Sequence, residues 1–516
     1  MMTKIMFVVV LLALSIVYTK NALHMFQQNR YELYRYSKWL FNKNNLHFSF
    51  VVIFIPVLIV LYLIFKSNFI SLVLIVLFAV YVLTNENKKE YVKDLVYTGR
   101  VKRQIVVLSI LLILMNCLLV SFMPIAFISI FDIFGPYLLI YVMHVITYPF
   151  ESLIKKGYEN DARRKLNSMN NLIKVGITGS FGKTTTKNIV TDILSNSYYV
   201  LMTPASYNTP MGITRTIREM MKPIHELFVC EMGADHVGEI TYLMNFVKPQ
   251  YGIVTSIGPQ HLNTFKSMDN IVKEKMQMIE KLPGDGVGII NGDNPYISSY
   301  KIKNTCKVVK VGIKNKDVDY LATNIKYSNS GSSFTVELDG KPCKFKTILL
   351  GEHNIMNLLV GIALAKELGI PNKEIVKSIS EVNRVEHRLE IKKINGFNFI
   401  DNAFNSNPVG SRYSLDVLSL MNGKRVIVTP GLIDLGEKQK QYNYEFGSYM
   451  KGKADFVILV GEKTSKDVYQ GLKDSGFDIN NVKMCASEKE AFAFVYYNFS
   501  EKDTILLEND LPDAFL

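Results

Sequence analysis

The sequence has few cysteines, and no two of them lie close enough in sequence to form a motif. The five cysteines of the 516-residue chain are widely spaced and odd in number, and no Cys-x-x-Cys pair is present. This argues against a disulfide framework and against a cysteine-ligated zinc site. The net charge is +13, but the basic residues are spread along the chain and gather mainly beside apolar runs. We therefore expect no nucleic-acid partner.

Charge is almost absent from two long stretches in the first third of the chain. Between residues 48 and 84 the only charged residue is Lys66, and between residues 104 and 150 it is Asp132. A membrane-spanning helix needs about 20 mainly apolar residues. Each stretch is therefore predicted to hold two spans, with breaks at Lys66 and near Pro124.

The N-terminal run from Ile5 to Tyr18 is either a fifth span or a cleaved signal sequence. Basic clusters follow the first, third and fifth apolar runs, and Lys and Arg prefer the cytoplasmic side of a membrane. Five spans with the N-terminus outside would place all three clusters in the cytoplasm. We expect a multi-pass protein of the cell membrane with cytoplasmic catalytic domains. Asp132 and His144 leave open a polar pathway for transport.

A glycine-rich loop stands between a predicted strand and a predicted helix. The segment "NLIKVGITGS" is typical of a buried strand, and "KTTTKNIVTDIL" has its apolar residues at helical spacing. Backbone N–H groups around Gly179 and Gly182 would cradle phosphates, Lys183 would meet their oxygens, and Thr184 would face a magnesium ion. An ordinary glycine-rich turn is the alternative.

The loop "TGSFGKTT", Thr178 to Thr185, resembles that of the Mur ligases, ATP-dependent enzymes that build peptide stems on cell-wall precursors. The resemblance runs from about Lys174 to Leu516. It continues through "TPASYNTPMGI", "VCEMGADHVGEI", "NGDN", "GEHNIMNLLVGIALAKELG" and "IDNAFNSNPVGSRYSLDVL". The segment around Glu231 is similar to the corresponding segment in the branch of the family that adds D-alanyl-D-alanine (MurF-like).

The resemblance implies a set of site residues. The implied ATP contacts are Gly179, Ser180, Gly182, Lys183, Thr184, Thr185, Asn291, Asn354 and Asn357. The implied magnesium ligands are Thr184, Glu231, His261 and Lys275, the last as a carbamylated lysine, with Lys273 as its near competitor. The implied substrate contacts are Asn208, Thr209, Asn405 and Asn407. The implied catalytic residues are Lys183, His261, Lys275, Arg388 and Asp401.

The predicted architecture has three parts, and the soluble parts are of the α/β class. N-terminal transmembrane helices occupy residues 1–150, a Mur-type central P-loop ATPase domain occupies residues 151–383, and a Rossmann-like domain occupies residues 384–516. In the last part, "KRVIVTPGL", "DFVILVGE", "NVKMCAS" and "DTILLEND" are predicted to be short buried strands of a small doubly wound unit.

The chain departs from the family pattern at both ends. Mur ligases normally begin with a soluble domain that holds a uridine-diphosphate sugar, and here apolar runs stand in its place. The C-terminal stretch reads "LLENDLPDAFL" where the MurF-like branch usually carries Lys-Gly-Ser.

The resemblance implies a membrane-anchored ligase that uses ATP and Mg²⁺, through an acyl phosphate, to join an amino acid or dipeptide to a carboxylate. That acceptor could be lipid-linked or polymeric, in cell-wall (peptidoglycan) or surface-glycan synthesis. The alternatives are a poly-γ-glutamate-type synthetase and an ATP-driven transport or assembly protein.

Overall fold

The computed structural model describes residues 2–42, 64, 73, 94–403, 407–433, 435–461 and 465–509. It separates into two compact units, of which the first ends at Gly157 and the second begins at Tyr158. The predicted spans within residues 48–84 lie outside the described residues. The predicted division of the later part near residue 384 stays a prediction, because the second unit continues through it.

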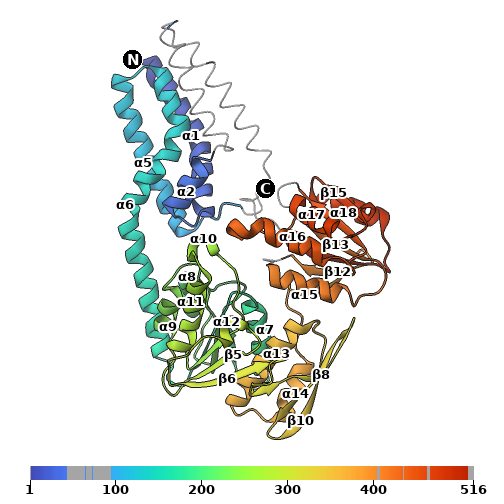
Figure 1. Ribbon diagram of the computed structural model, residues 1–516. Helices are drawn as coiled ribbons and strands as arrows, with labels where there is room; N and C mark the ends of the chain where they lie inside the picture. The colour runs from blue at the N-terminus through green and yellow to red at the C-terminus, as the bar shows by residue number, and fades with distance from the viewer. Residues whose placement is uncertain are drawn as a thin grey trace. The chain divides into compact units, whose positions relative to one another are not determined.

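The first unit is helical throughout the part that the structure describes (Figure 1). Its helices are α1 (Met2–Gln28), α2 (Leu33–Leu40), α5 (Gly99–Phe122) and α6 (Ile125–Asn167), the last of which continues into the second unit. The break predicted near Pro124 is confirmed, because α5 ends at Phe122 and α6 begins at Ile125.

Two of the described helices, Gly99–Phe122 and Ile130–Asn167, are long and apolar enough to cross a membrane. A buried core helix or a signal sequence can meet the same criteria of length and composition. The two helices are therefore weak support for membrane anchoring, and the larger number of spans stays a prediction.

Asp132 links two helices of the first unit. Its side chain is 1% exposed, and its Oδ1 accepts a hydrogen bond of 2.7 Å from Asn116 Nδ2 of α5. A hydrogen bond between neighbouring helices in an apolar setting fixes their register. The contact gives Asp132 a role in packing, and the transport reading of this residue gains no support from it.

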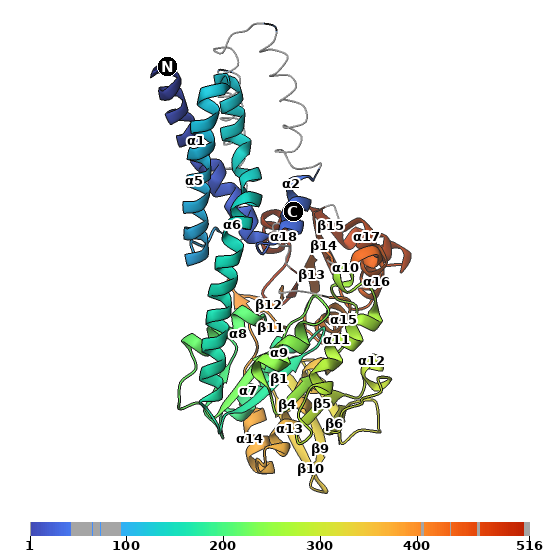
Figure 2. The same ribbon diagram turned by 90° about the vertical axis from the view of Figure 1, so that its left-hand side faces the viewer.

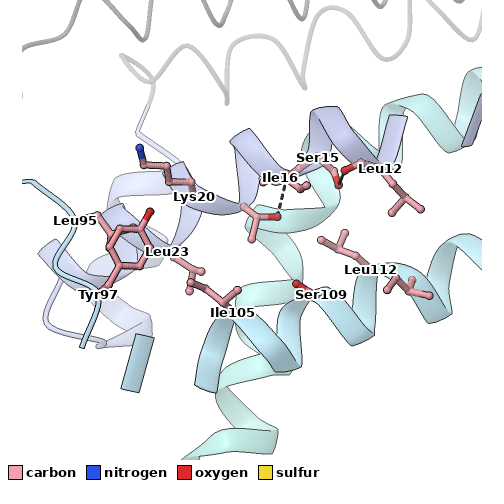
Figure 3. A pocket seen from close by; sticks show the side chains of 12 residues that line it. Leu12, Ser15, Ile16, Lys20, Leu23, Leu95, Tyr97, Ile105, Ser109 and Leu112 are labelled. Carbon is pink, nitrogen blue, oxygen red and sulfur yellow. Dashed lines mark hydrogen bonds between the residues drawn. The ribbon is translucent and has the colours of Figure 1, made fainter. Parts of the chain in front are cut away.

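A pocket of about 490 Å³ lies between α1 and α5. Figure 3 shows aliphatic side chains of both helices facing each other across it, with the Lys20 ammonium near one end. The hydroxyl of Thr19 donates a hydrogen bond to the Ser15 carbonyl within α1. This pocket lacks the glycine loop and the clustered charges that a nucleotide requires.

The middle part of the second unit is built on a seven-stranded parallel sheet (Figure 2). Its strands, in spatial order, are β2 (Val200–Met202), β3 (Leu227–Glu231), β1 (Ile173–Thr178), β4 (Tyr251–Val254), β5 (Val287–Asn291), β6 (Lys307–Gly312) and β7 (Tyr320–Leu321). Every residue of β3 is buried, as expected for a parallel strand covered on both faces. The order of the strands reverses at β1, and ligands bind at such reversal points in open α/β sheets.

Helices cover both faces of this sheet. One face packs against α7 (Lys183–Leu194) and α13 (Glu352–Glu367), and a small antiparallel sheet of β8 (Thr323–Ser328), β9 (Gly331–Leu338) and β10 (Lys341–Thr347) extends the same core. The other face packs against the end of α6, α8 (Pro210–Glu219), α9 (Glu239–Val247) and α11 (Met268–Glu280). The short helices α10 (Leu262–Phe265) and α12 (Pro295–Ser298) follow β4 and β5, and α14 (Asn372–Ser380) packs beside α13.

The last part holds a six-stranded sheet in which β11 alone runs antiparallel. Its order is β11 (Glu390–Ile394), β12 (Phe397–Asn402), β16 (Thr504–Glu508), β13 (Arg425–Thr429), β14 (Phe456–Val460) and β15 (Val482–Cys485). One face packs against α15 (Pro408–Leu418), α16 (Gln439–Tyr449) and α17 (Ser465–Asp474), and the other against α18 (Glu488–Asn498). The predicted doubly wound unit is confirmed, with all four predicted strands present.

Candidate active site

The glycine-rich loop connects β1 to α7, as predicted. Gly179 has φ of +151° and Gly182 has φ of +80°, both in the range that favours glycine. A Cβ atom added at Gly179 would clash with Thr255 Oγ1. The loop is also braced by the segment after β4, because the Ser180 backbone N–H donates to the Ser256 carbonyl at 2.7 Å. The turn before α7 is thus held by its glycine conformations and by the segment after β4.

The side chain of Lys183 folds over this loop. Its Nζ donates to the carbonyls of Gly179 at 2.8 Å and Ser180 at 3.2 Å. Burial lowers the pKa of Lys183, and the charge of Glu231 works in the opposite direction. Thr184 and Thr185 follow in the first turn of the helix, where backbone N–H groups lack partners within the helix. Lys183 and these amides together form an anion-binding end of α7.

Glu231 ends β3, next to β1, and is 1% exposed. Its Oε1 accepts a hydrogen bond of 2.9 Å from Asn208 Nδ2. The ammonium of Lys187 lies 3.2 Å from its Oε2, but no group in the described chain donates a well-aligned hydrogen bond to that oxygen. Lys187 Nζ donates instead to the carbonyl of Ala205. Glu231 is therefore a buried carboxylate with an oxygen still able to accept a ligand.

Two predicted substrate contacts, Asn208 and Thr209, have structural partners. Asn208 holds Glu231, and its carbonyl accepts from the Gly233 backbone N–H at 2.8 Å. Thr209 is the N-cap of α8, where its hydroxyl accepts from the Gly212 backbone N–H at 3.3 Å. Substrate binding by these two residues stays a prediction.

Lys275 and its competitor Lys273 differ in burial. Lys275 is 1% exposed, whereas Lys273 lies on the exposed face of α11. Lys275 Nζ donates to the Ala234 carbonyl at 2.9 Å, three residues after Glu231. Burial and the nearby charge of Lys183 lower the pKa of Lys275 to about 7. A substantial fraction of this amine is therefore neutral near neutral pH.

The predicted histidine ligand lies at the start of α10. His261 is half-buried, and its backbone has φ of +52°, which is uncommon for a residue other than glycine. Residues held in strained conformations often lie at functional sites. Its role as a metal ligand stays a prediction.

The residues predicted to contact the nucleoside lie on β5 and α13. Asn291 Oδ1 accepts from the Asp293 backbone N–H at 3.0 Å. Asn357 Oδ1 accepts from Thr186 Oγ1 at 3.0 Å, which joins α13 to the helix of the glycine loop. Asn354 donates to the Leu350 carbonyl, while its buried Oδ1 accepts no hydrogen bond from the described residues. Asn354 therefore keeps one acceptor for a ligand.

The C-terminal part contributes two predicted catalytic residues. Burial lowers the pKa of Arg388, and the charges of Glu231 and Glu508 act in the opposite direction, so the guanidinium interacts electrostatically with Glu231. Asp401 accepts from His387 Nδ1 at 2.7 Å and from Lys392 Nζ at 2.9 Å, which gives it a structural role, and its catalytic role stays a prediction. Asn405 lies outside the described residues. Asn407 is the N-cap of α15, where its Oδ1 accepts from two backbone N–H groups, so its substrate role also stays a prediction.

The sequence reasoning missed Lys187 and Glu274. Lys187 lies one turn after Lys183 on α7, and residues four apart share a helix face, so this spacing could have revealed it. Glu274 is 2% exposed and accepts from the Gly238 and Ile240 backbone N–H groups, which fixes the start of α9 beside the Lys275 contact. No local sequence signal points to Glu274.

One further group of possible metal ligands lies in the described chain. The ligand atoms of Asp235, His236 and Glu239 are all within 4.8 Å of one another. Glu239 already accepts from the backbone N–H groups of the other two residues, as expected for a carboxylate in the first turn of a helix. We assign this group a structural role.

Comparisons with known proteins agree with this geometry. Residues 177–365 match the Mur ligase middle domain, and residues 387–508 match the Mur ligase glutamate ligase domain. The UDP-N-acetylmuramoyl-tripeptide--D-alanyl-D-alanine ligase of Bacillus subtilis is 30% identical over 338 residues, which cover 65% of this chain and 72% of that enzyme. The Escherichia coli enzyme of the same name is 27% identical, covering 62% and 73%.

Solved structures show the same fold. MurF from Acinetobacter baumannii has a TM-score of 0.62 and 24% identity, and the match covers 69% of this chain and 77% of that one. MurF ligase from Thermotoga maritima, solved in complex with ADP, has a TM-score of 0.62 and 20% identity, covering 69% and 80%. The resemblance seen in the sequence is confirmed: the chain belongs to the Mur ligase family and is an ATP-dependent ligase that forms amide bonds.

Proposed function

We propose that the protein is a membrane-anchored ligase that joins the amine of an amino acid or dipeptide to the carboxylate of a peptidoglycan precursor through an acyl phosphate. The Bacillus subtilis and Escherichia coli relatives are named for joining D-alanyl-D-alanine to a UDP-N-acetylmuramoyl tripeptide. The precursor class follows from these names. The anchoring follows from the apolar helices that precede the ligase domains.

The excess of buried positive charge at the glycine loop carries the proposal. At the carboxyl end of the middle sheet Lys187 is buried and Lys183 is half-buried, and the charge of Glu231, which pairs with Lys187, acts on both lysines and on Arg388. Isolated buried charges are costly unless a partner offsets them. Phosphate groups of a nucleotide are the partners that this arrangement fits.

The donor set also fits a magnesium ion. Hard cations take oxygen ligands, and Glu231 Oε2 is a buried carboxylate oxygen whose neighbour in the described chain is the Lys187 ammonium at 3.2 Å. Thr184, Glu231, His261 and Lys275 would hold the ion. When bound, magnesium supplies positive charge against the charge that develops on the transferring phosphoryl group.

Lys275 suits a carbamate better than a bare ammonium. Its lowered pKa of about 7 leaves the amine partly neutral, and only a neutral amine adds to carbon dioxide. Addition of the neutral amine forms a nitrogen–carbon bond, breaks one carbon–oxygen π bond of carbon dioxide and releases one proton. Counted from the ammonium, two protons leave in all and a cation becomes an anion. The hydrogen bond to Ala234 holds the nitrogen close to the Glu231 segment, so the new carboxylate would join the oxygen ligands.

Two steps then form the amide. An acceptor carboxylate oxygen attacks the γ-phosphorus, the bond to the β-phosphate oxygen breaks, and ADP leaves. The amine nitrogen next attacks the acyl carbon, loses a proton and expels phosphate. Lys183 and the first-turn amides of α7 would stabilise the negative charge on the phosphoryl oxygens, and Arg388 would add positive charge from the C-terminal part.

The defining experiment measures ADP and amide together. Full-length protein purified in detergent receives ATP and Mg²⁺ with candidate amino acids, D-alanyl-D-alanine, a UDP-N-acetylmuramoyl tripeptide or a membrane-lipid extract. We expect ADP to appear in equal amount with an amide product identified by mass spectrometry. ATP hydrolysis without a covalent product would favour the transport or assembly alternative, and repeated addition of glutamate would favour a poly-γ-glutamate synthetase.

Anchoring has a separate test, because the ligase reaction does not require it. The full-length protein should stay in the membrane fraction after an alkaline carbonate wash, and a C-terminal tag should be digested by protease only from the cytoplasmic face. Anchoring raises the effective concentration of a substrate held in the same membrane. Release of the protein by carbonate would remove this part of the proposal.

A further inference from the structure

Lys187 is a buried cation beside Glu231, the proposed metal ligand. The reaction steps described above assign no role to Lys187. Its side chain is 1% exposed, and it projects from α7 one turn beyond Lys183. Its ammonium contacts two groups, the Glu231 carboxylate at 3.2 Å and the Ala205 carbonyl. An apolar residue of similar length would fill the same space without the cost of desolvating a charge. The position of that charge therefore needs an explanation.

The geometry places Lys187 on the oxygen that a metal ion would use. Asn208 occupies Glu231 Oε1, whereas Lys187 faces Oε2, the oxygen with no well-aligned hydrogen bond in the described chain. Ala205 and Asn208 lie on one loop, between β2 and α8. Lys187 thus fixes the carboxylate and its supporting loop while cancelling the negative charge of Glu231.

We propose that Lys187 is a positioning residue that makes cation binding at Glu231 depend on the nucleotide. The proposal rests on the metal role proposed above for Glu231. With Lys187 paired to Glu231 and Lys183 nearby, a divalent cation entering alone meets two ammonium groups beside that carboxylate. Nucleotide phosphates add several negative charges that offset these ammonium groups. Cation and nucleotide then bind together, and a cation alone is excluded.

The test uses Mn²⁺ as a spectroscopic probe in the full-length protein purified in detergent. Free and bound Mn²⁺ are distinguished by electron paramagnetic resonance, with and without ADP. Wild-type protein should bind Mn²⁺ weakly alone and much more tightly with ADP. Strong binding of Mn²⁺ to the wild type without nucleotide would overturn the proposal, and this measurement requires no variant.

Lys187→Gln removes the charge and keeps a side-chain N–H donor. We expect Mn²⁺ binding without nucleotide to tighten by at least about tenfold, the scale of one unit-charge interaction at a partly screened site. Lys187→Arg keeps the charge and should behave as the wild type. Lys174→Gln is the matched control, because Lys174 is a half-buried lysine on β1 of the same sheet, outside the site.

Glu231→Gln separates failure of this inference from failure of the proposed function. If Glu231→Gln binds Mn²⁺ with ADP as tightly as the wild type, the metal role of Glu231 is wrong. If Glu231→Gln loses binding but folded Lys187→Gln binds as the wild type does, the metal role stands and the role of Lys187 is wrong. Circular dichroism spectra establish that each variant is folded.

Discussion

The two large sheets of the ligase unit differ in how the charged side chains at their carboxyl ends are paired. At the carboxyl end of the middle sheet, the buried Lys187, the half-buried Lys183 and Arg388 share the charge of the Glu231 carboxylate. At the carboxyl end of β12 in the last sheet, Asp401 is matched by His387 and Lys392. Both positions suit a ligand by topology alone. Charge balance distinguishes them, because an excess of one sign indicates an absent counter-charge, while matched pairs stabilise the protein.

This difference predicts where substitutions act. Removing a middle-sheet lysine should alter chemistry far more than folding, since it relieves the repulsion among buried cations. Removing a partner from the last sheet should alter stability more than chemistry. The following substitutions test this contrast.

Lys183→Ala should give the largest effect. Loss of the ammonium that meets the phosphates should lower the rate of ATP-dependent amide formation by about a hundred- to a thousandfold. The readout is the initial rate of ADP and amide formation, with Lys174→Ala as the control. An unimpaired Lys183→Ala enzyme would refute the assignment of the loop.

Lys275→Ala should lower the rate by about a hundredfold, because it removes one anionic ligand and its stabilisation of charge in the transition state. Added acetate or formate should restore part of the rate by supplying a carboxylate in the vacated space. Lys273→Ala is the matched control, since Lys273 is exposed on the same helix. Equal losses for both lysines, or no recovery with acid, would contradict the carbamate.

Gly179→Ala should weaken ADP binding by about tenfold, the effect of roughly one lost phosphate contact. The added Cβ would meet Thr255 Oγ1 and the carbonyl of Ser256, which brace the loop. Gly284→Ala is the control, because its Cβ would have only an ordinary contact with Thr305. Calorimetric titration with ADP measures the change, and unchanged affinity would mean that the loop does not need this geometry.

Asp401→Asn should give the smallest effect on chemistry and a loss of stability of about 1–2 kcal/mol near pH 7. Burial raises the pKa of Asp401, but bonds from Lys392, Ala403 and His387 outweigh it and the net pKa is lowered. A lowered pKa stabilises the fold fully above the unfolded aspartate value of about 3.9 and less as the pH falls through the folded value.

The stability difference between wild type and Asp401→Asn should therefore shrink in acid. Thermal unfolding at pH 7 and at lower pH measures it, with exposed Asp317→Asn as the control. A difference that grows in acid would show that the pair around Asp401 is not what stabilises this sheet.

Local sequence patterns predicted the parts of the fold that depend on short segments. Strand, glycine loop and helix were predicted around Gly179, and β1 and α7 are present at those places. The small sheet of β8, β9 and β10 was not predicted. Its strand β8 is largely exposed, whereas β9 and β10 show the alternation of buried and exposed residues that marks a strand.

The sequence by itself determined the family, the phosphate loop and the short list of candidate ligands, because glycine, lysine and helical spacing act over a few residues. Only the tertiary structure decided that Lys275 is buried while Lys273 is exposed, and that Lys187 pairs with Glu231. Those facts depend on β3 lying beside β1 and on α11 packing over the sheet. Such long-range packing sets burial and charge balance, and a linear pattern does not contain it.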